Sequence, residues 1–226
     1  MTGASVRWID FIFPRRCALC DCVLGRKEQM LCARCASERL PVRRGECVQM
    51  EHALFEFAAA PFLYRGPVRD SVLRMKYGGR AEYARFFAEM ILEAAGAPVA
   101  AWGPQAVIPV PVHPERLSGR GYNQAEEIAR HIARRMRLPM ITDAVRRVHR
   151  TRPQKELTAQ ERKNNLRGAF GATGRRVPER ILVVEKNKRI MIQACVAISK
   201  GFLGIIKSIG ERRTGVLSPV LTFQTV

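Results

Sequence analysis

The sequence predicts an α/β protein with a small cysteine-rich module at its N-terminus. Six of the seven cysteines lie within the first 47 residues, and apolar segments of two kinds alternate along the rest of the chain. Segments 106–110 and 181–184 have the length and composition of buried strands, whereas 81–95 and 125–136 repeat apolar residues at helical spacing. Strands that alternate with helices are typical of a parallel sheet covered by helices on both faces.

Three further segments complete this pattern. Segment 53–64 is aromatic and apolar without a helical period, which predicts a strand or a hairpin. Pro67 suits the first turn of a short helix, and the two glycines at 78 and 79 end that helix. A loop rich in glycine and arginine, residues 116–121, precedes the second of the two longer helices.

The N-terminal cysteines have the spacing of a metal site. Two CxxC pairs, separated by eleven residues, contribute Cys17, Cys20, Cys32 and Cys35. Each CxxC turn presents two thiolates to one ion from the same side, so two turns complete a tetrahedral site. Four thiolates leave no open position, so we expect a structural Zn²⁺ that stabilises a module too small for a core of its own. Cys22 could replace Cys20 in a looser site, and incidental or redox-active thiols are the other interpretations.

The chain is strongly basic, with 39 lysines and arginines against 20 acids and a formal net charge of +19. Such a surplus favours polyanionic partners, either nucleic acid or phosphorylated metabolites. The 47% hydrophobic content argues against wholesale disorder, and no apolar run reaches the ~18 residues needed to span a bilayer. The N-terminus lacks the pattern of a signal peptide, so we expect a cytoplasmic protein without membrane insertion.

Two loops contain side chains suited to binding anions. The candidates in the first, between a strand and a helix N-terminus, are Arg116, Arg120, Gly121, Asn123 and Gln124. Ligands of open α/β sheets bind at that end of the strands and a helix N-terminus favours anions, so this loop suits a phosphate or pyrophosphate. A solvated basic loop is the alternative. The second loop, between 149 and 170, is dense in basic and amide side chains, with the candidates Arg150, Arg152, Gln154 and Arg162.

Four ordered motifs extend over residues 8–184. An apolar start leads into the first cysteine pair, at Phe11-Ile12-Phe13-Pro14-Arg15-Arg16-Cys17. The second motif comprises Tyr64, Gly66, Arg69, Val72, Lys76 and Gly79. The third and fourth are Pro109-Val110-Pro111 with Arg120-Gly121-Tyr122-Asn123-Gln124, and then Thr151, Gln154, Leu157, Glu161, Arg162, Asn165, Ala169 and Phe170. In these motifs the chain resembles the ComF/GntX family of competence-associated, phosphoribosyltransferase-like proteins.

The resemblance implies a type I phosphoribosyltransferase fold, whose sheet presents its C-terminal edge to a pocket for phosphoribosyl pyrophosphate (PRPP). The loop after Pro111 would meet the pyrophosphate, and the region 120–124 would belong to a mobile hood. The chain would then comprise a zinc-ribbon module (1–50) and a phosphoribosyltransferase-like core (51–184), which we expect to have separate hydrophobic cores. The implied partners are single-stranded DNA and proteins of the DNA-uptake machinery, and Mg²⁺ is expected only if PRPP is bound.

The segment after residue 184 departs from the family pattern. At this point the family carries a motif of the form DDxxTTGxT, in which two acids hold the ribose hydroxyls and the turn wraps the 5′-phosphate. Here only Glu185 keeps an acid, and the second acid, both threonines and the glycine are missing. Lysines cannot replace these parts, because glycine permits close backbone approach and hydroxyls bind the phosphate. We therefore expect weak PRPP binding or none, and a catalytically impaired protein.

The composition changes at the same point. Residues 1–184 contain 28 arginines and 4 lysines, whereas 185–226 contain 3 arginines and 4 lysines. Isoleucine occurs 8 times in the longer part and 6 times in the shorter. We interpret 185–226 as a divergent tail from a frame shift, an insertion or a fused foreign end, with a naturally divergent lineage as the alternative. This tail replaces the PRPP loop and the last elements, although 190–209 is apolar enough to pack as a helix.

Three functions are open at this point. The first is a phosphoribosyltransferase-like protein with an impaired catalytic site that acts in DNA uptake, competence or the use of external DNA. The basic charge, the predicted zinc ribbon and the arginine-rich loops agree with it. The second is an active PRPP-dependent phosphoribosyltransferase, which needs the missing turn. The third is a non-functional, truncated or frame-shifted remnant.

Overall fold

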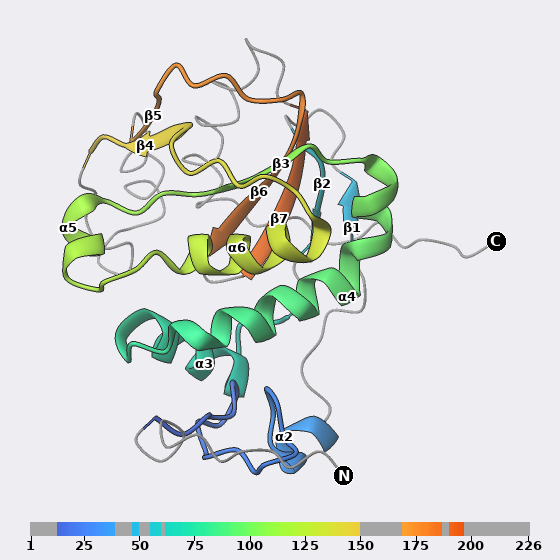
Figure 1. Cartoon of the computed structure of the whole chain (residues 1–226), viewed down its shortest axis with the longest axis vertical. Coiled ribbons are helices and arrows are strands. Elements are labelled where there is room, and N and C mark those ends of the chain that lie inside the picture. Colours follow the sequence, from blue (N-terminus) through green and yellow to red (C-terminus); the bar gives the residue numbers. More distant parts are fainter. Residues whose placement is uncertain are drawn as a thin grey trace.

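The computed structural model describes residues 13–38, 47–49, 55–59, 62–149, 169–186 and 190–196. In chain order, its elements are α2 (Ala33–Ser37), β1 (Cys47–Gln49), β2 (Phe55–Ala59), α3 (Gly66–Tyr77), the 3-10 turn η1 (Ala81–Tyr83), α4 (Ala84–Trp102), β3 (Ala106–Pro109), α5 (Pro114–Ser118), α6 (Gln124–Met136), β4 (Val145–Arg147), β5 (Phe170–Ala172), β6 (Arg180–Lys186) and β7 (Ile190–Val196). Figure 1 shows the sheet and α6 on one side of α3 and α4, and the cysteine-rich segment with α2 on the other. None of the helices in the described ranges is long and apolar enough to cross a membrane.

The main sheet is mixed, with the strand order β1-β2-β7-β6-β3. Only β3 and β6 run parallel in it, with Val107 opposite Leu182, and its other three pairs are antiparallel. The expected all-parallel sheet is therefore wrong beyond this one pair. A parallel neighbour needs a crossover of a dozen or more residues, whereas only residues 187–189 separate β6 from β7.

The two parallel strands, β3 and β6, are buried on both faces, but different elements cover the two faces. Val107, Leu182 and Val184 pack in one cluster with residues of α4 and α6. Their neighbours in the strands point the other way, because side chains alternate along a strand. Ile108 and Val183 accordingly pack in a second cluster that includes residues of β4 and β5. Among the described residues, helices cover one face and the β4–β5 pair covers the other, which corrects the prediction of helices on both faces.

The predicted helices are confirmed, with two changes at their ends. Helix α3 begins with Pro67 in its first turn and ends before Gly78, as predicted. Helix α4 continues to Trp102 although Pro98 lies inside it, because Val99 is buried and anchors the last turns in the core. Helix α6 buries the predicted apolar face. Part of the predicted loop 116–121 belongs to the short helix α5.

The segment after β6 forms a strand where we expected a helix. Residues 190–196 are β7, which pairs with β6 on one side and with β2 on the other. Two strand neighbours satisfy its backbone groups more completely than a helix end at the edge of the core would, and a short apolar run carries no periodicity that distinguishes the two structures. The rest of the predicted helix, from residue 197, lies outside the described residues.

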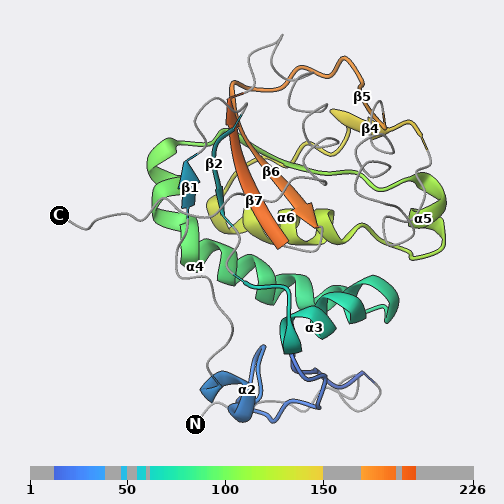
Figure 2. The same cartoon turned by 180° about the vertical axis from the view of Figure 1, so that it is seen from behind.

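The cysteine-rich segment shares its core with the helices, so the expectation of separate cores is wrong. Cys17, Leu19 and Cys35 belong to the same buried cluster as Met75 and Phe86. Figure 2, the view from behind, shows this segment on the side of α3 and α4 that faces away from the sheet. A short segment with few apolar residues cannot bury enough surface alone, and it packs onto the helices instead.

Polar contacts fix the same interface. The guanidinium of Arg74 in α3 donates to the carbonyl of Leu19 at 2.8 Å. The hydroxyl of buried Tyr83 donates to the carboxylate of Asp21, which also forms an ion pair with Arg80 at 3.3 Å. Burial and the bond to Asp21 raise the pKa of Tyr83, so this hydroxyl stays a donor.

We predict that Tyr83→Phe lowers the free energy of unfolding by about 1–2 kcal/mol, because it removes one hydrogen bond to a carboxylate. Urea unfolding followed by tryptophan fluorescence measures the change. Tyr64→Phe is the matched control, since the hydroxyl of this half-buried residue makes no hydrogen bond within the described part of the chain. Equal stability of the Tyr83→Phe and wild-type proteins would contradict the importance of this contact.

Candidate functional site

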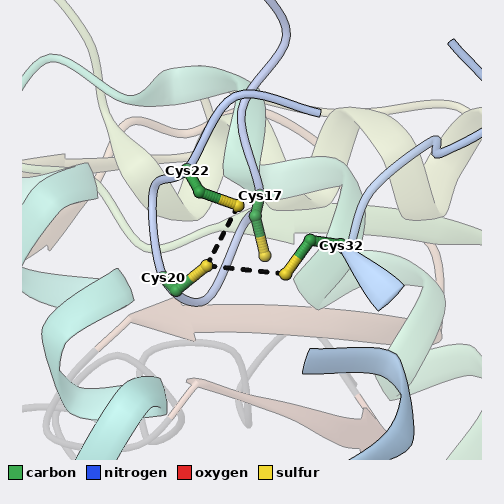
Figure 3. A group of neighbouring side chains, drawn as sticks. All are labelled: Cys17, Cys20, Cys22 and Cys32. Atoms are coloured by element: carbon green, nitrogen blue, oxygen red, sulfur yellow. Dashed lines mark hydrogen bonds between the residues drawn. The ribbon is translucent and has the colours of Figure 1, made fainter. Parts of the chain in front are cut away.

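Four cysteine sulfurs meet at one point of the N-terminal segment. The Sγ atoms of Cys17, Cys20, Cys22 and Cys32 all lie within 4.8 Å of one another. Figure 3 shows the four side chains converging, with Cys20 3.4 Å from Cys22 and 3.6 Å from Cys32. Four thiolates in a tetrahedron around Zn²⁺, each at about 2.3 Å, would lie about 3.8 Å apart. The donor set and its spacing fit a metal ion.

Backbone hydrogen bonds shape the two turns that present these sulfurs. In the first turn, the amide of Cys17 donates to the carbonyl of Cys22, and Asp21 adopts a left-handed conformation with φ +66°. The second turn leads into α2, with Cys32 as its N-cap residue. The carboxylate of Glu28 accepts from the amides of Gly25 and Ala33, both at 2.6 Å. These two bonds lower the pKa of Glu28 and connect the turns.

Cys35 is a fifth thiol at the edge of this group. It is buried on α2 in the same cluster as Cys17 and Cys32, with Cys20 packed against that cluster. Burial and these three neighbours raise its pKa, whereas the backbone amide of Cys35 lowers the pKa of Cys32. The structure thus brings together three of the four predicted ligands in one tight group with Cys22, and places the fourth beside them.

The signal for Cys22 was present in the sequence. It stands two residues after Cys20, and the left-handed Asp21 between them turns both side chains to the same side. If Cys17, Cys20 and Cys32 all bind the ion, either Cys22 or Cys35 can complete the set of four. These two candidates for the fourth ligand differ in burial, because Cys22 is exposed to solvent and Cys35 is buried.

The second candidate region is the loop between α5 and α6, and its polar side chains hold it in place. Gly121 has φ +80°, which favours glycine. The side chain of Asn123 caps α6 by accepting from the amide of Ala125 at 3.1 Å, and it donates to the carbonyl of Val110 at 3.1 Å. Asn123 and Gln124 are buried, so their amides serve the loop itself.

This loop is attached to the end of helix α3 through one carbonyl. The hydroxyl of Tyr122 and the Nε2 of Gln124 both donate to the carbonyl of Met75, the second at 3.2 Å. Met75 lies in the last turn of α3, where carbonyls lack a partner within the helix. The same Gln124 accepts from Arg120 at 3.0 Å through its Oε1. The predicted anion-binding residues are therefore brought together, with Gln124 as the link between helix and guanidinium.

Arg120 is the most constrained cation of the loop. It is half-buried, and its guanidinium lies 5.8 Å from the ring centre of Tyr77. Lys76 approaches the same ring, with its Nζ 4.9 Å from the centre. Burial, followed by the charge of Arg116, lowers the pKa of Arg120, although it remains a cation at neutral pH. The motif resemblance included Lys76, but no sequence signal identified Tyr77.

Glu185, the one acid kept from the expected motif, is buried near the C-terminal end of β6. The neighbouring strand β3 ends beside it, since the amide of Val110 donates to the carbonyl of Val184 at 2.9 Å. On its other side Glu185 pairs in register with Met191 of β7. At this end of β6, the next strand of the sheet is therefore β7, which pairs with β6 in the antiparallel direction. The second predicted basic loop, with Arg150, Arg152, Gln154 and Arg162, lies outside the described residues.

Curated relatives of the chain have names that refer to competence or to DNA utilization. "Competence protein F" of Haemophilus influenzae is 40% identical over 67 residues, which are 30% of this chain and 29% of that protein. "DNA utilization protein YhgH" is 26% identical in Escherichia coli O6:H1 and 27% identical in Salmonella typhimurium. Each of these two matches spans 161 residues, 68% of this chain and 69% of the relative. No family model matches the chain, and no solved structure matches it.

We predict one metal ion per chain after reducing, chelator-free purification, measured by elemental analysis and native mass spectrometry. Cys17→Ser should lose the ion and destabilise the helices as well, because Cys17 lies in their shared core. Cys22→Ser and Cys35→Ser should each keep an ion that a chelator removes more easily, and the double variant should keep none. Full loss of metal in either single variant would show that the two thiols do not substitute for each other.

Proposed function

We propose that this chain is a member of the ComF family and binds single-stranded DNA as an accessory protein in DNA uptake or use, which the names of its curated relatives support. The observation that carries the proposal is the cationic end of the α5–α6 loop, where Arg116, Arg120 and Lys76 gather. Within the described part of the chain, neither Arg120 nor Lys76 forms an ion pair with a carboxylate. Phosphate groups are suitable partners for such a surface.

Two arginines of α6 show the contrast. Arg130 is paired with Glu126 at 3.0 Å and with Glu127 at 2.5 Å, and Arg135 lies 3.7 Å from Glu89. Those positive charges are neutralised within the protein. The excess of +19 therefore acts most strongly where cations are not paired with carboxylates, as at Arg120 and Lys76 among the described residues.

We also propose that the metal is Zn²⁺ and that it is structural. Soft thiolate ligands in a tetrahedral set favour Zn²⁺ among the common divalent ions. With Cys17, Cys20 and Cys32 in both possible sets, a fourth thiolate closes the site to water and substrate. The ion would hold the two turns together against α3 and α4, and it would take no part in a reaction.

We infer that the core is related to phosphoribosyltransferases but impaired as an enzyme. The parallel pair β3–β6, with a polar loop after β3, supports the relationship. At the end of β6 the chain continues into β7, and its sequence there contains no threonine- and glycine-rich turn to wrap a 5′-phosphate. Buried Glu185 at this edge is the one observation that favours the alternative of an active, PRPP-dependent transferase, with Mg²⁺ as its cofactor.

We predict that single-stranded DNA binds with an affinity that falls steeply as salt rises. Each phosphate that the protein neutralises adds about −0.7 to the log–log slope, so replacing Arg116 and Arg120 with glutamine should flatten the slope by roughly one to two units. Binding of labelled oligo-dT at several salt concentrations measures the slope. The matched control replaces Arg134 and Arg137 at the far end of α6, which removes the same charge. Equal flattening by both pairs would mean that only net charge matters.

We predict no measurable PRPP binding at micromolar concentrations, in the presence of Mg²⁺, by isothermal titration. The absence of two or three charge-assisted hydrogen bonds, at ~1.5–3 kcal/mol each, removes several powers of ten in affinity. Micromolar binding would instead favour the active transferase. Failure to bind either PRPP or DNA would favour the non-functional remnant.

A further inference from the structure

We propose that Tyr77 is a stacking platform for one unpaired base of single-stranded DNA, with Lys76 and Arg120 placed to contact the adjoining phosphates. The inference rests on the proposed function and assigns the place on the surface where DNA is held. It concerns a residue that neither the motifs nor the charge pattern identified.

Tyr77 differs from the other aromatic side chains of its region in being exposed. Tyr83, Phe86 and Phe87 of the adjoining η1 and α4 are fully buried in the core. Tyr77 is the last residue of α3, and 69% of its surface is exposed. Val72 and Met75 of the same helix are buried. The ring of Tyr77 therefore lies outside the core, and most of its surface can be reached by a ligand.

Two cationic side chains lie over this ring, close enough to contact the phosphates of a base stacked on it. Lys76 Nζ lies 4.9 Å from the ring centre and the Arg120 guanidinium 5.8 Å from it. Proteins that bind single strands combine aromatic rings, on which bases stack, with cations that follow the backbone. A base on Tyr77 would bring its own phosphates to these two side chains. The exposed part of the ring offers a planar surface beside these two cations, which phosphate contacts alone would not use.

The platform is assembled before any ligand arrives. Ring and guanidinium come from different segments, which meet at the Met75 carbonyl, where Tyr122 and Gln124 donate. Gln124 in turn holds Arg120 at 3.0 Å. Groups that are already fixed lose little conformational entropy on binding, so more of the stacking energy is available for affinity.

The experiment compares two labelled oligonucleotides of equal length, oligo-dT and an abasic strand with the same phosphates, by fluorescence anisotropy. The variants are Tyr77→Leu, which removes the ring, and Tyr77→Phe, which keeps it. The matched control is Phe13→Leu, because Phe13 is also an exposed aromatic residue, at 72%, in the cysteine-rich segment. Thermal unfolding of each variant checks that the fold is intact.

We expect Tyr77→Leu to weaken oligo-dT binding about five- to hundredfold, the range of one base–aromatic stack, while Tyr77→Phe and Phe13→Leu bind as the wild type does. The wild type should prefer oligo-dT to the abasic strand by a similar factor, and Tyr77→Leu should lose that preference.

Wild-type protein that binds both strands equally, or Tyr77→Leu that binds oligo-dT normally, would overturn the platform and leave the proposed DNA binding intact. Wild-type protein that binds neither strand would overturn the proposed function itself. Should Tyr77→Leu fail to fold, Tyr77→His keeps a smaller ring and should bind oligo-dT with an affinity between those expected for Tyr77→Leu and Tyr77→Phe, and equal binding of the two strands by wild-type protein would still overturn the platform.

Discussion

The carbonyl of Met75 accepts two side-chain hydrogen bonds, and the arrangement of the basic loop depends on them. Helix α3 ends with carbonyl groups that its own backbone cannot satisfy, and Tyr122 and Gln124 supply donors from the α5–α6 loop. The same helix turn carries Arg74, which donates to Leu19 in the first cysteine turn. Two consecutive residues of α3 therefore connect the cysteine-rich segment on one side with the cationic loop on the other.

Because of this connection, a bound metal ion would stabilise parts of the fold other than its ligands. The cysteines lie in the core that α3 and α4 also line, so binding of an ion would stabilise helices that contribute no ligand. The bonds of Asp21 to the buried Tyr83 and to Arg80 fix the same turn. The cysteine-rich segment is thus part of the framework that positions the loop, rather than an appendage to it.

The sheet limits what chemistry its C-terminal edge can perform. The parallel pair β3–β6 ends beside the polar loop, as in a fold that binds ligands at this edge. After residues 187–189 the chain returns alongside β6 as the antiparallel strand β7. The proposed DNA binding through Lys76, Arg120 and Tyr77 does not depend on a turn at the end of β6. The proposed impairment of substrate binding around Glu185 follows from the threonines, glycine and second acid that the sequence lacks there.

Much of the fold could be predicted from the sequence, because helical periodicity, proline and glycine positions and CxxC spacing are local properties of the chain. The buried faces of α4 and α6 and the meeting of Cys17, Cys20 and Cys32 follow from such patterns. The place of β7 could not be predicted in this way, because an apolar run becomes a strand only when distant strands pair with it.

The same limit applies to the candidate sites. The sequence by itself determined the cysteine cluster and the basic character of the loop, since residue type and spacing suffice for both. Only the tertiary structure decided that Cys22 joins the cluster, that Asn123 and Gln124 are used inside the loop, and that Tyr77 faces solvent beside Arg120. Exposure and contact depend on which distant segments pack against a residue, and no local pattern records those partners.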